Sequence, residues 1–253
     1  MLRKNNNQYL KTNRKIREKI FHDEVFETKA RRKLSVFYSI NESVRKEFAE
    51  LSLKYISKRI LEIGCGLGSY ATSVALKGAK VSAIDISEYA IKEAKKRCNN
   101  ENLKIDFRIM DAENLKFKDN EFDLVYGLAI LHHLNLKAVI PEIHRVLRKG
   151  GKAIFIEPMA HNPFINVFRF LTPKLRSKDE HPLRMQDLQL LSKDFSGFEF
   201  KFYYFLSLFT VPFYKLLFFN QIKYFLGKLD EKIFAVIPSL KRFAWQVLLI
   251  LEK

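Results

Sequence analysis

Between residues 60 and 158, short apolar runs alternate with longer stretches in which apolar residues recur at helical spacing. The runs are continuously apolar, as is typical of strands buried on both faces. They occupy residues 60–63, 80–85, 105–110, 122–127 and 152–158. The helical stretches include residues 69–77, followed by Gly78, and residues 138–149, followed by Gly150 and Gly151. This α/β alternation predicts a doubly wound, mostly parallel sheet with binding residues at the carboxyl ends of its strands.

Beyond residue 158 the pattern changes. Prolines and charged residues punctuate residues 160–183, which predicts a loop insertion over the site. Residues 185–195 predict a further helix, and residues 198–202 alternate apolar and polar side chains as a strand does.

Residues 203–219 are almost entirely apolar or aromatic, although Pro212 interrupts them and Lys215 adds a charge. A bilayer-spanning helix needs about 20 consecutive apolar residues, so we predict no transmembrane span. We predict that residues 205–243 form an interfacial helical hairpin or a hydrophobic lid over a lipophilic acceptor. A helical pair packed on the sheet and a dimer contact are the alternatives.

The first 33 residues are strongly basic and carry a thin apolar stripe that includes Ile16, Ile20 and Val25. Such a stretch predicts a basic amphipathic helix that either lies on a membrane or caps the domain. A second helix is predicted near residues 41–55. We therefore divide the chain into a basic N-terminal helical cap, residues 1–56, and one α/β domain, residues 57–253.

Three glycines, Gly64, Gly66 and Gly68, follow the first apolar run at alternate positions. Glycine lets the backbone turn sharply and brings a ligand close to bare N–H groups. The dinucleotide fingerprint G-x-G-x-x-G would need glycine at position 69, where the chain has Ser69. The pattern instead predicts a G-x-G-x-G ligand turn preceded by Glu62, with an ordinary glycine turn as the alternative.

Residues 61–68, Leu-Glu-Ile-Gly-Cys-Gly-Leu-Gly, resemble the first motif of the class I S-adenosylmethionine-dependent methyltransferases that act on small molecules. The resemblance continues in register from about residue 60 to residue 158. It implies a seven-stranded sheet with residues 244–251 as an antiparallel last strand. It also implies S-adenosyl-L-methionine as cofactor and S-adenosyl-L-homocysteine as product, with Phe37 or Tyr38 closing over the cofactor unless both are core residues.

Aspartates end the second and third predicted strands. The carboxylate of Asp85 offers paired lone pairs to the two hydroxyls of a ribose, and Ser87 already provides the start signal of the next helix. For Asp111 the resemblance implies a place near the adenine amino group. The cofactor residues that the resemblance implies are Glu62, Gly64, Cys65, Gly66, Gly68, Asp85, Ile86, Asp111, Ala112 and Tyr126.

Methyl transfer from a sulfonium consists largely of aligning the acceptor with the methyl group. A hydroxyl or acidic-carbon acceptor also needs deprotonation, usually by histidine. The candidate catalytic residues are His132, His161 and His181, which lie beyond the strand ends. For His132 and the adjacent His133, packing under the cofactor is the alternative role.

Two further residues near the predicted site carry charge. Glu157 ends the fifth apolar run and is a second kind of candidate base. Arg176, in the predicted loop insertion, either binds an anionic group of the acceptor or forms a surface salt bridge.

The chain has 253 residues, of which 47% are hydrophobic, and a net charge of +17. The charge suggests an acidic partner such as a membrane surface or nucleic acid, or else serves solubility. The two cysteines, Cys65 and Cys98, provide neither a disulfide framework nor a metal-ligand cluster, so we expect no metal site. The N-terminus is polar and charged, unlike a secretory signal, and predicts a cytoplasmic protein with possible peripheral membrane contact.

Three functions are compatible with these motifs. The first is O- or C-methylation of a small, lipophilic or membrane-linked acceptor, and the others are RNA methylation and cofactor binding without catalysis. No appended RNA-binding signature is present, and Tyr-Gly-Leu-Ala at residues 126–129 replaces an Asn-Pro-Pro-Tyr-like segment. The intact cofactor motifs argue against lost cofactor binding. We therefore predict a small-molecule methyltransferase, with its oligomeric state open.

Overall fold

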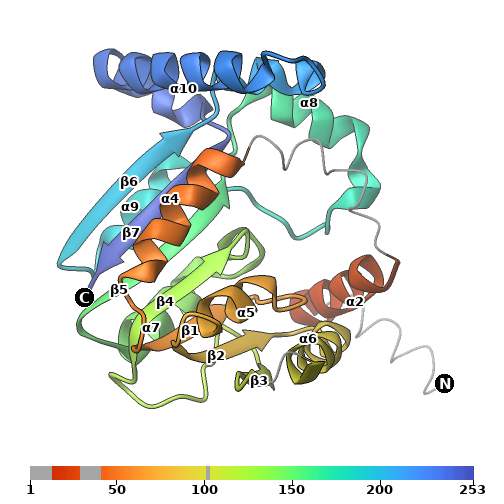
Figure 1. The fold of residues 1–253 in the computed structure, drawn as a ribbon, viewed down its shortest axis with the longest axis vertical. Coiled ribbons are helices and arrows are strands. Elements are labelled where there is room, and N and C mark those ends of the chain that lie inside the picture. Colours follow the sequence, from red (N-terminus) through yellow and green to blue (C-terminus); the bar gives the residue numbers. More distant parts are fainter. Residues whose placement is uncertain (1–12, 29–40, 101–102) are drawn as a thin grey trace.

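A computed structural model describes residues 13–28, 41–100 and 103–253 of the chain (Figure 1). The predictions for Phe37 and Tyr38, and for the basic residues in 1–12 and 29–40, lie outside the described residues.

One seven-stranded sheet organises the described chain, in the order β3-β2-β1-β4-β5-β7-β6. Strands β1 to β5 pair in parallel, whereas β7 runs antiparallel to both β5 and β6. This confirms the predicted doubly wound sheet with an antiparallel last strand. The strands are β1 (Arg59–Ile63), β2 (Lys80–Asp85), β3 (Asp106–Ile109), β4 (Phe122–Leu128), β5 (Leu147–Pro158), β6 (Gly197–Tyr203) and β7 (Gln246–Glu252).

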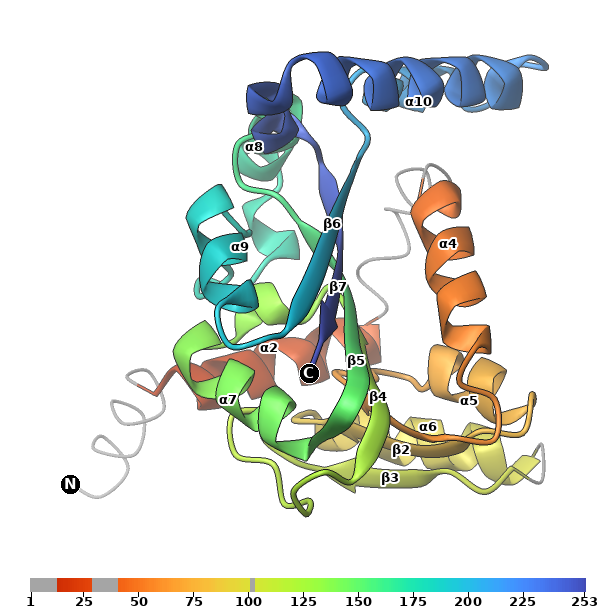
Figure 2. The ribbon, with the colours of Figure 1, turned by 90° about the vertical axis from the view of Figure 1, so that its left-hand side faces the viewer.

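Helices cover both faces of the sheet because successive residues of its buried strands point to opposite sides. In β1, Leu61 and Ile63 join the apolar core shared with α7 (Leu136–Val146) and α9 (Met185–Ser192). Ile60 joins the core on the other side, with α4 (Glu42–Leu53), α5 (Ser69–Ala75) and α6 (Glu88–Asn100). Figure 2 shows α7 and α9 on one side of the sheet and α4 on the other.

The junction of α7 and β5 differs from the prediction. The helix predicted at residues 138–149 ends at Val146, and β5 begins directly after it, five residues before the predicted strand. Leu147 pairs with Phe122, and the N–H of Gly150 donates to the carbonyl of Lys253 at 2.8 Å. Ladder bonds to β4 and to the end of the chain therefore extend this strand through the glycines.

Residues 160–183 were predicted to form a loop, and this is only partly right. They contain the helix α8 (Pro163–Leu171) and the short helix η3 (Pro173–Leu175). The side chain of Asn162 caps α8 by accepting a hydrogen bond from the N–H of Ile165 at 3.0 Å. Pro163 occupies the first turn, where a helix tolerates proline. The proline that indicated a loop is thus a helix-start signal.

The apolar segment after β6 forms η4 (Ser207–Phe213), α10 (Phe219–Val236) and η5 (Pro238–Phe243). Asp230 of α10 joins α10 to η4, since its carboxylate accepts hydrogen bonds from the N–H groups of Phe205, Leu206 and Ser207. Across the described residues, each helix is too short or too polar to cross a bilayer.

Candidate functional site

The glycine turn after β1 is held in a left-handed conformation. Gly64, Gly66 and Gly68 have φ angles of +69°, +50° and +77°, which L side chains rarely adopt. The N–H groups of Gly64 and Cys65 donate to the carbonyl of Ile84 at 2.9 and 3.0 Å, so the turn is attached to the end of β2. Gly68 is the N-cap of α5, which follows the turn.

Asp85 lies at the carboxyl end of β2 and braces the same turn. Its Oδ2 accepts the N–H of Gly66, and its Oδ1 accepts the N–H of Ser87, both at 2.8 Å. Burial raises the pKa of Asp85, although these two hydrogen bonds oppose the shift. Each carboxylate oxygen keeps a second lone pair, so Asp85 can still accept hydrogen bonds from a vicinal diol.

Glu62 stands beside the turn, almost fully buried. Its Oε2 accepts a hydrogen bond from the hydroxyl of Tyr126 at 3.1 Å. Burial raises the pKa of Glu62 to about 8, despite that bond. Tyr126 is itself fully buried and acts on the site by orienting Glu62.

A cavity of about 510 Å³ opens at the carboxyl ends of β1, β2, β3 and β4, within the size range of small-molecule sites. It brings together eight of the ten predicted cofactor residues: Glu62, Gly64, Cys65, Gly66, Asp85, Ile86, Asp111 and Ala112. Of the other two, Gly68 caps α5 and Tyr126 lies behind Glu62. The roles of these residues toward a cofactor stay predictions.

Helix α2 (Arg14–Thr28) contributes residues to this cavity that the sequence analysis did not identify as site residues. Lys15 Nζ lies 2.5 Å from Asp111 Oδ2 and 3.1 Å from Glu113 Oε2. Glu18 and His22 also line the cavity. Their i, i+4 spacing, which places two side chains on one helical face, is the sequence signal that could have revealed them.

The predicted apolar stripe of this helix is only partly right. Val25 is buried, but Ile20 is 53% exposed and the charged Glu18 is buried in its place. Polar side chains of this helix have polar partners on the cavity wall. Arg14, for example, donates hydrogen bonds to Glu113 and to the carbonyl of His133.

Comparison with known proteins agrees with this geometry. Residues 61–155 match the family model described as a methyltransferase domain. A ubiquinone biosynthesis O-methyltransferase of Dechloromonas aromatica is 32% identical over 122 residues, which are 47% of this chain and 52% of that protein. The chain spans about half the length of the curated relatives it matches.

Residues 61–155 therefore belong to a methyltransferase domain, and the fold is that of the class I, S-adenosylmethionine-dependent methyltransferases.

Solved structures show the same fold as the methyltransferase domain. A phosphoethanolamine N-methyltransferase 2 of Haemonchus contortus, in complex with S-adenosyl-L-methionine, has a TM-score of 0.57 at 18% identity, over 78% of this chain and 49% of that chain. A protein of Pyrococcus horikoshii has a TM-score of 0.53 at 19% identity, over 83% of this chain and 90% of that chain. At these identities the likeness shows the fold alone.

The cavity of the methyltransferase domain fits S-adenosyl-L-methionine. Gly66 and Phe26 of α2 both line the cavity, and a Cβ on Gly66 would approach the ring of Phe26 to 3.1 Å, so a side chain there would narrow the cavity. Asp85 and Asp111 both line the cavity, as predicted for a ribose and an adenine contact, and those two roles stay predictions. Lys15 Nζ stands beside Asp111 on this wall of the cavity, 2.5 Å from Oδ2.

None of the three predicted catalytic histidines lines the cavity of the methyltransferase domain. His132 is buried, with Nδ1 2.7 Å from Glu157 Oε2. His161 and His181 are exposed, and the N–H of His181 donates to the carbonyl of His132 at 2.8 Å. Their catalytic roles stay predictions, whereas His133, the neighbour of His132, does line the cavity.

The two other charged candidates have structural partners. Glu157 is fully buried and accepts the N–H groups of Ile130 and Leu131 at 2.9 and 2.8 Å. Burial raises the pKa of Glu157 to about 7. Arg176 pairs with Glu180 at 3.6 Å and lies over the ring of Phe168, outside the cavity.

The buried carboxyl group of Glu62 predicts a pH-dependent loss of stability. Below its ordinary pKa, near 4.5, both the folded and the unfolded state hold the proton, and the group costs nothing. As the pH rises to about 8, the unfolded state ionises freely while the folded state resists ionisation. The wild type should therefore lose on the order of 2–4 kcal/mol of stability between pH of about 5 and about 9 because of Glu62, and Glu62→Gln should not show this loss.

Urea denaturation of both proteins at the two pH values measures this difference. Glu88→Gln, at an exposed position on α6, is the matched control and should follow the wild type. Parallel pH profiles for Glu62→Gln and the wild type would show that Glu62 titrates normally.

Proposed function

We propose that this protein transfers a methyl group from S-adenosyl-L-methionine to an oxygen atom of a small lipophilic acceptor. The observation that carries the proposal is the cavity at the strand ends, where the glycine turn, Asp85 and Asp111 meet. The bound cofactor supplies an activated methyl group. The chain's residues hold it by the ribose at Asp85 and by the adenine at Asp111, and α2 excludes water from that side.

Methylation at oxygen has support from the curated relatives, which are named ubiquinone biosynthesis O-methyltransferases. The similarity covers only about half of the length of these relatives, so an acceptor related to theirs is part of our proposal for this chain. A hydroxyl acceptor needs a proton acceptor nearby. His22 and His133 are the histidines of the described residues that line the cavity.

A lipophilic acceptor has support from the surface formed by α8, η4 and α10, which lie at one end of the molecule in Figure 2. Phe164 of α8 contacts Phe209 of η4, with ring centroids 4.3 Å apart, so the two segments form one surface. Most of the large apolar side chains that the described residues expose lie on these helices or on residues 214–218, which join η4 to α10. They include Val167, Phe170, Leu171, Phe213, Leu216, Leu217, Phe218, Tyr224 and Phe225.

We infer that this apolar surface rests on a membrane. Phe170 is 83% exposed and Leu217 is 92% exposed. Exposure of large apolar side chains to water is unfavourable, and clusters of them usually mark a surface that binds a membrane or another apolar partner. Lys174 of η3, which follows α8, and Lys215, between η4 and α10, are exposed and can contact anionic lipid headgroups. An enzyme held there reaches an acceptor that is dissolved in the bilayer.

Sedimentation with anionic phospholipid vesicles tests the membrane contact. Phe170→Asp combined with Leu217→Asp should weaken vesicle binding at least about tenfold, because two apolar side chains no longer enter the bilayer. Leu76→Asp is the matched control, since Leu76 is 63% exposed on another part of the molecule, after α5. Equal vesicle binding by the double variant and the wild type would contradict the membrane contact.

Methyl transfer is tested with S-adenosyl-L-methionine labelled in the methyl group and a bacterial lipid extract as the source of acceptor. The proposal predicts label in the organic phase, in a product that resists mild alkali, which would release the label of a methyl ester as methanol. Label in added RNA, or in neither fraction when bound cofactor is demonstrated, would contradict the proposal.

A further inference from the structure

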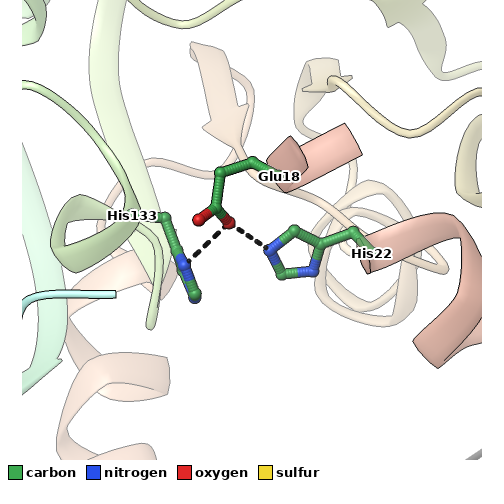
Figure 3. Close-up of side chains that lie close together, drawn as sticks. All are labelled: Glu18, His22 and His133. Atoms are coloured by element: carbon green, nitrogen blue, oxygen red, sulfur yellow. Dashed lines mark ion pairs between the residues drawn. The ribbon is translucent and has the colours of Figure 1, made fainter. Parts of the chain in front are cut away.

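Three side chains with metal-binding atoms meet where α2 packs against the segment after β4. Glu18 and His22 come from α2, and His133 comes from the short helix η2 (Leu131–His133), as Figure 3 shows. Glu18 Oε2 lies 3.1 Å from His133 Nδ1 and 3.4 Å from His22 Nε2. One ligand atom from each residue lies within 4.8 Å of the other two.

These separations are those of atoms that share a metal ion. Nitrogen and oxygen ligands lie about 2.0–2.2 Å from Zn²⁺, so two ligands in tetrahedral positions are about 3.3–3.5 Å apart. The distances of 3.1 and 3.4 Å around Glu18 Oε2 are close to that value. One turn of helix between Glu18 and His22 places both ligands on the same face.

The cluster also has buried polar atoms that make no hydrogen bond to the described residues. Glu18 is 4% exposed and His133 is 3% exposed. Within the described residues, Glu18 Oε2 and His133 Nδ1 make no hydrogen bond of good geometry, in spite of their proximity. A buried polar atom without a partner costs about 1–3 kcal/mol, and a cation that accepts both lone pairs would remove this cost.

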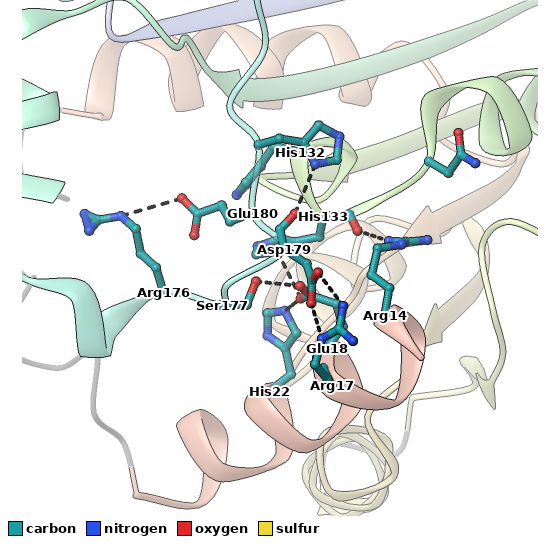
Figure 4. A network of polar contacts seen from close by, with 12 residues as sticks. Arg14, Arg17, Glu18, His22, His132, His133, Arg176, Ser177, Asp179 and Glu180 are labelled. Carbon is teal, nitrogen blue, oxygen red and sulfur yellow. Dashed lines mark hydrogen bonds and ion pairs between the residues drawn. The ribbon is translucent and has the colours of Figure 1, made fainter. Parts of the chain in front are cut away.

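Residues behind the three ligands hold them in place. The hydroxyl of Ser177 donates a hydrogen bond to Glu18 Oε1, the oxygen that does not face the histidines. Arg17 pairs with Asp179 at 2.6 Å, which ties α2 to residues 177–180 (Figure 4). Such support of the ligand side chains is usual around metal ions in proteins.

A second group of three, His132, His133 and Glu180, comes within the same mutual distance but is already committed. His132 Nδ1 contacts Glu157 at 2.7 Å, and Glu180 pairs with Arg176 at 3.6 Å. The cluster around Glu18 is therefore the better candidate.

We propose that Glu18, His22 and His133 bind one divalent transition-metal ion. Two imidazoles and one carboxylate suit zinc or ferrous iron rather than Mg²⁺ or Ca²⁺, which prefer oxygen ligands. All three residues line the cavity, so a further coordination position faces it. This part of the inference rests on the proposed function: an acceptor hydroxyl in that position would be polarised by the metal ion and would release its proton more easily.

Binding of Co²⁺ to the full chain tests the site, with any histidine tag removed and bound metal stripped by a chelator. Co²⁺ in such a site gives visible absorption bands that report its ligands, and calorimetry with Zn²⁺ gives the affinity. We expect one equivalent of each ion. Glu18→Gln, His22→Asn and His133→Asn should each weaken Zn²⁺ binding at least about tenfold.

His144→Asn is the matched control, because His144 contacts Phe195 away from the cavity, and it should bind as the wild type does. His22→Cys replaces the imidazole by a shorter thiolate ligand at the same residue and should add a thiolate charge-transfer band to the Co²⁺ spectrum. This gain of signal does not depend on the stability of the ligand-removal variants.

Absence of Co²⁺ bands in the wild type, or an unchanged spectrum in His22→Cys, would overturn the metal site. Binding of S-adenosyl-L-homocysteine to the metal-free chain is measured in parallel. Retained binding without a metal site rejects this inference alone, whereas lost binding with an intact metal site rejects the proposed methyl transfer alone.

Discussion

Asp85→Ala should weaken the binding of S-adenosyl-L-homocysteine by about 100-fold or more. The substitution removes a carboxylate that can accept hydrogen bonds from both ribose hydroxyls, and hydrogen bonds to a charged group contribute about 1.5–3 kcal/mol each. It also frees the N–H groups of Gly66 and Ser87, so the glycine turn loses its brace to β2. Calorimetric titration of the purified variant measures the loss.

Asp106→Ala is the matched control for this experiment. Asp106 begins the neighbouring strand β3, and its half-exposed carboxylate pairs with Arg108 at the surface. The control should bind as the wild type does, and circular dichroism establishes that both variants are folded. Unaltered affinity in Asp85→Ala would remove the assignment of Asp85 to the ribose.

Gly64→Ala should destabilise the fold by about 2–5 kcal/mol. At φ +69° an L side chain is strained, and its Cβ would stand 2.6 Å from Cγ1 and 3.0 Å from Cβ of Ile130. The left-handed conformation costs about 1–2 kcal/mol, and the displacement of Ile130 adds about 1–3 kcal/mol. Urea denaturation at one pH gives the change in free energy of unfolding.

Gly150→Ala separates the two causes. Gly150 has a similar φ of +73°, but a Cβ there would meet no atom within 4 Å. It should show only the conformational cost, about 1–2 kcal/mol. Equal destabilisation in the two variants would mean that Ile130 moves aside freely and that the turn is not closely packed.

The parts of the fold and site that the sequence predicted are those set by local pattern. The continuous apolar run of β1, the glycines after it and Asp85 at the end of β2 lie within about 25 residues of one another. In a parallel sheet, strand ends meet at one edge whatever lies between them, so Asp111 also joins the cavity as predicted.

The boundaries that the sequence missed depend on partners distant in the chain. Glycine often ends a helix, but β5 runs through Gly150 because Leu147 pairs with Phe122 and the N–H of Gly150 donates to the carbonyl of Lys253. Pro163 indicated a loop in the sequence but begins α8 in the structure. Neither outcome can be read from the residue itself.

The contribution of α2 to the site could not be predicted for a similar reason. Glu18 and His133 are separated by more than 100 positions, and only the packing of α2 over the strand ends brings them together. The sequence also offered His132 and His133 as neighbours without distinguishing them. The structure turns His132 toward Glu157 and His133 toward the cavity.

The most direct test of the central claim is a crystal structure of the chain with S-adenosyl-L-homocysteine added at saturation. The account predicts electron density for the ligand between the glycine turn and α2, with its ribose hydroxyls on Asp85 and its adenine amino group near Asp111. Density for the ligand elsewhere, or a cavity that holds no ligand, would contradict the assignment of this cavity to the cofactor.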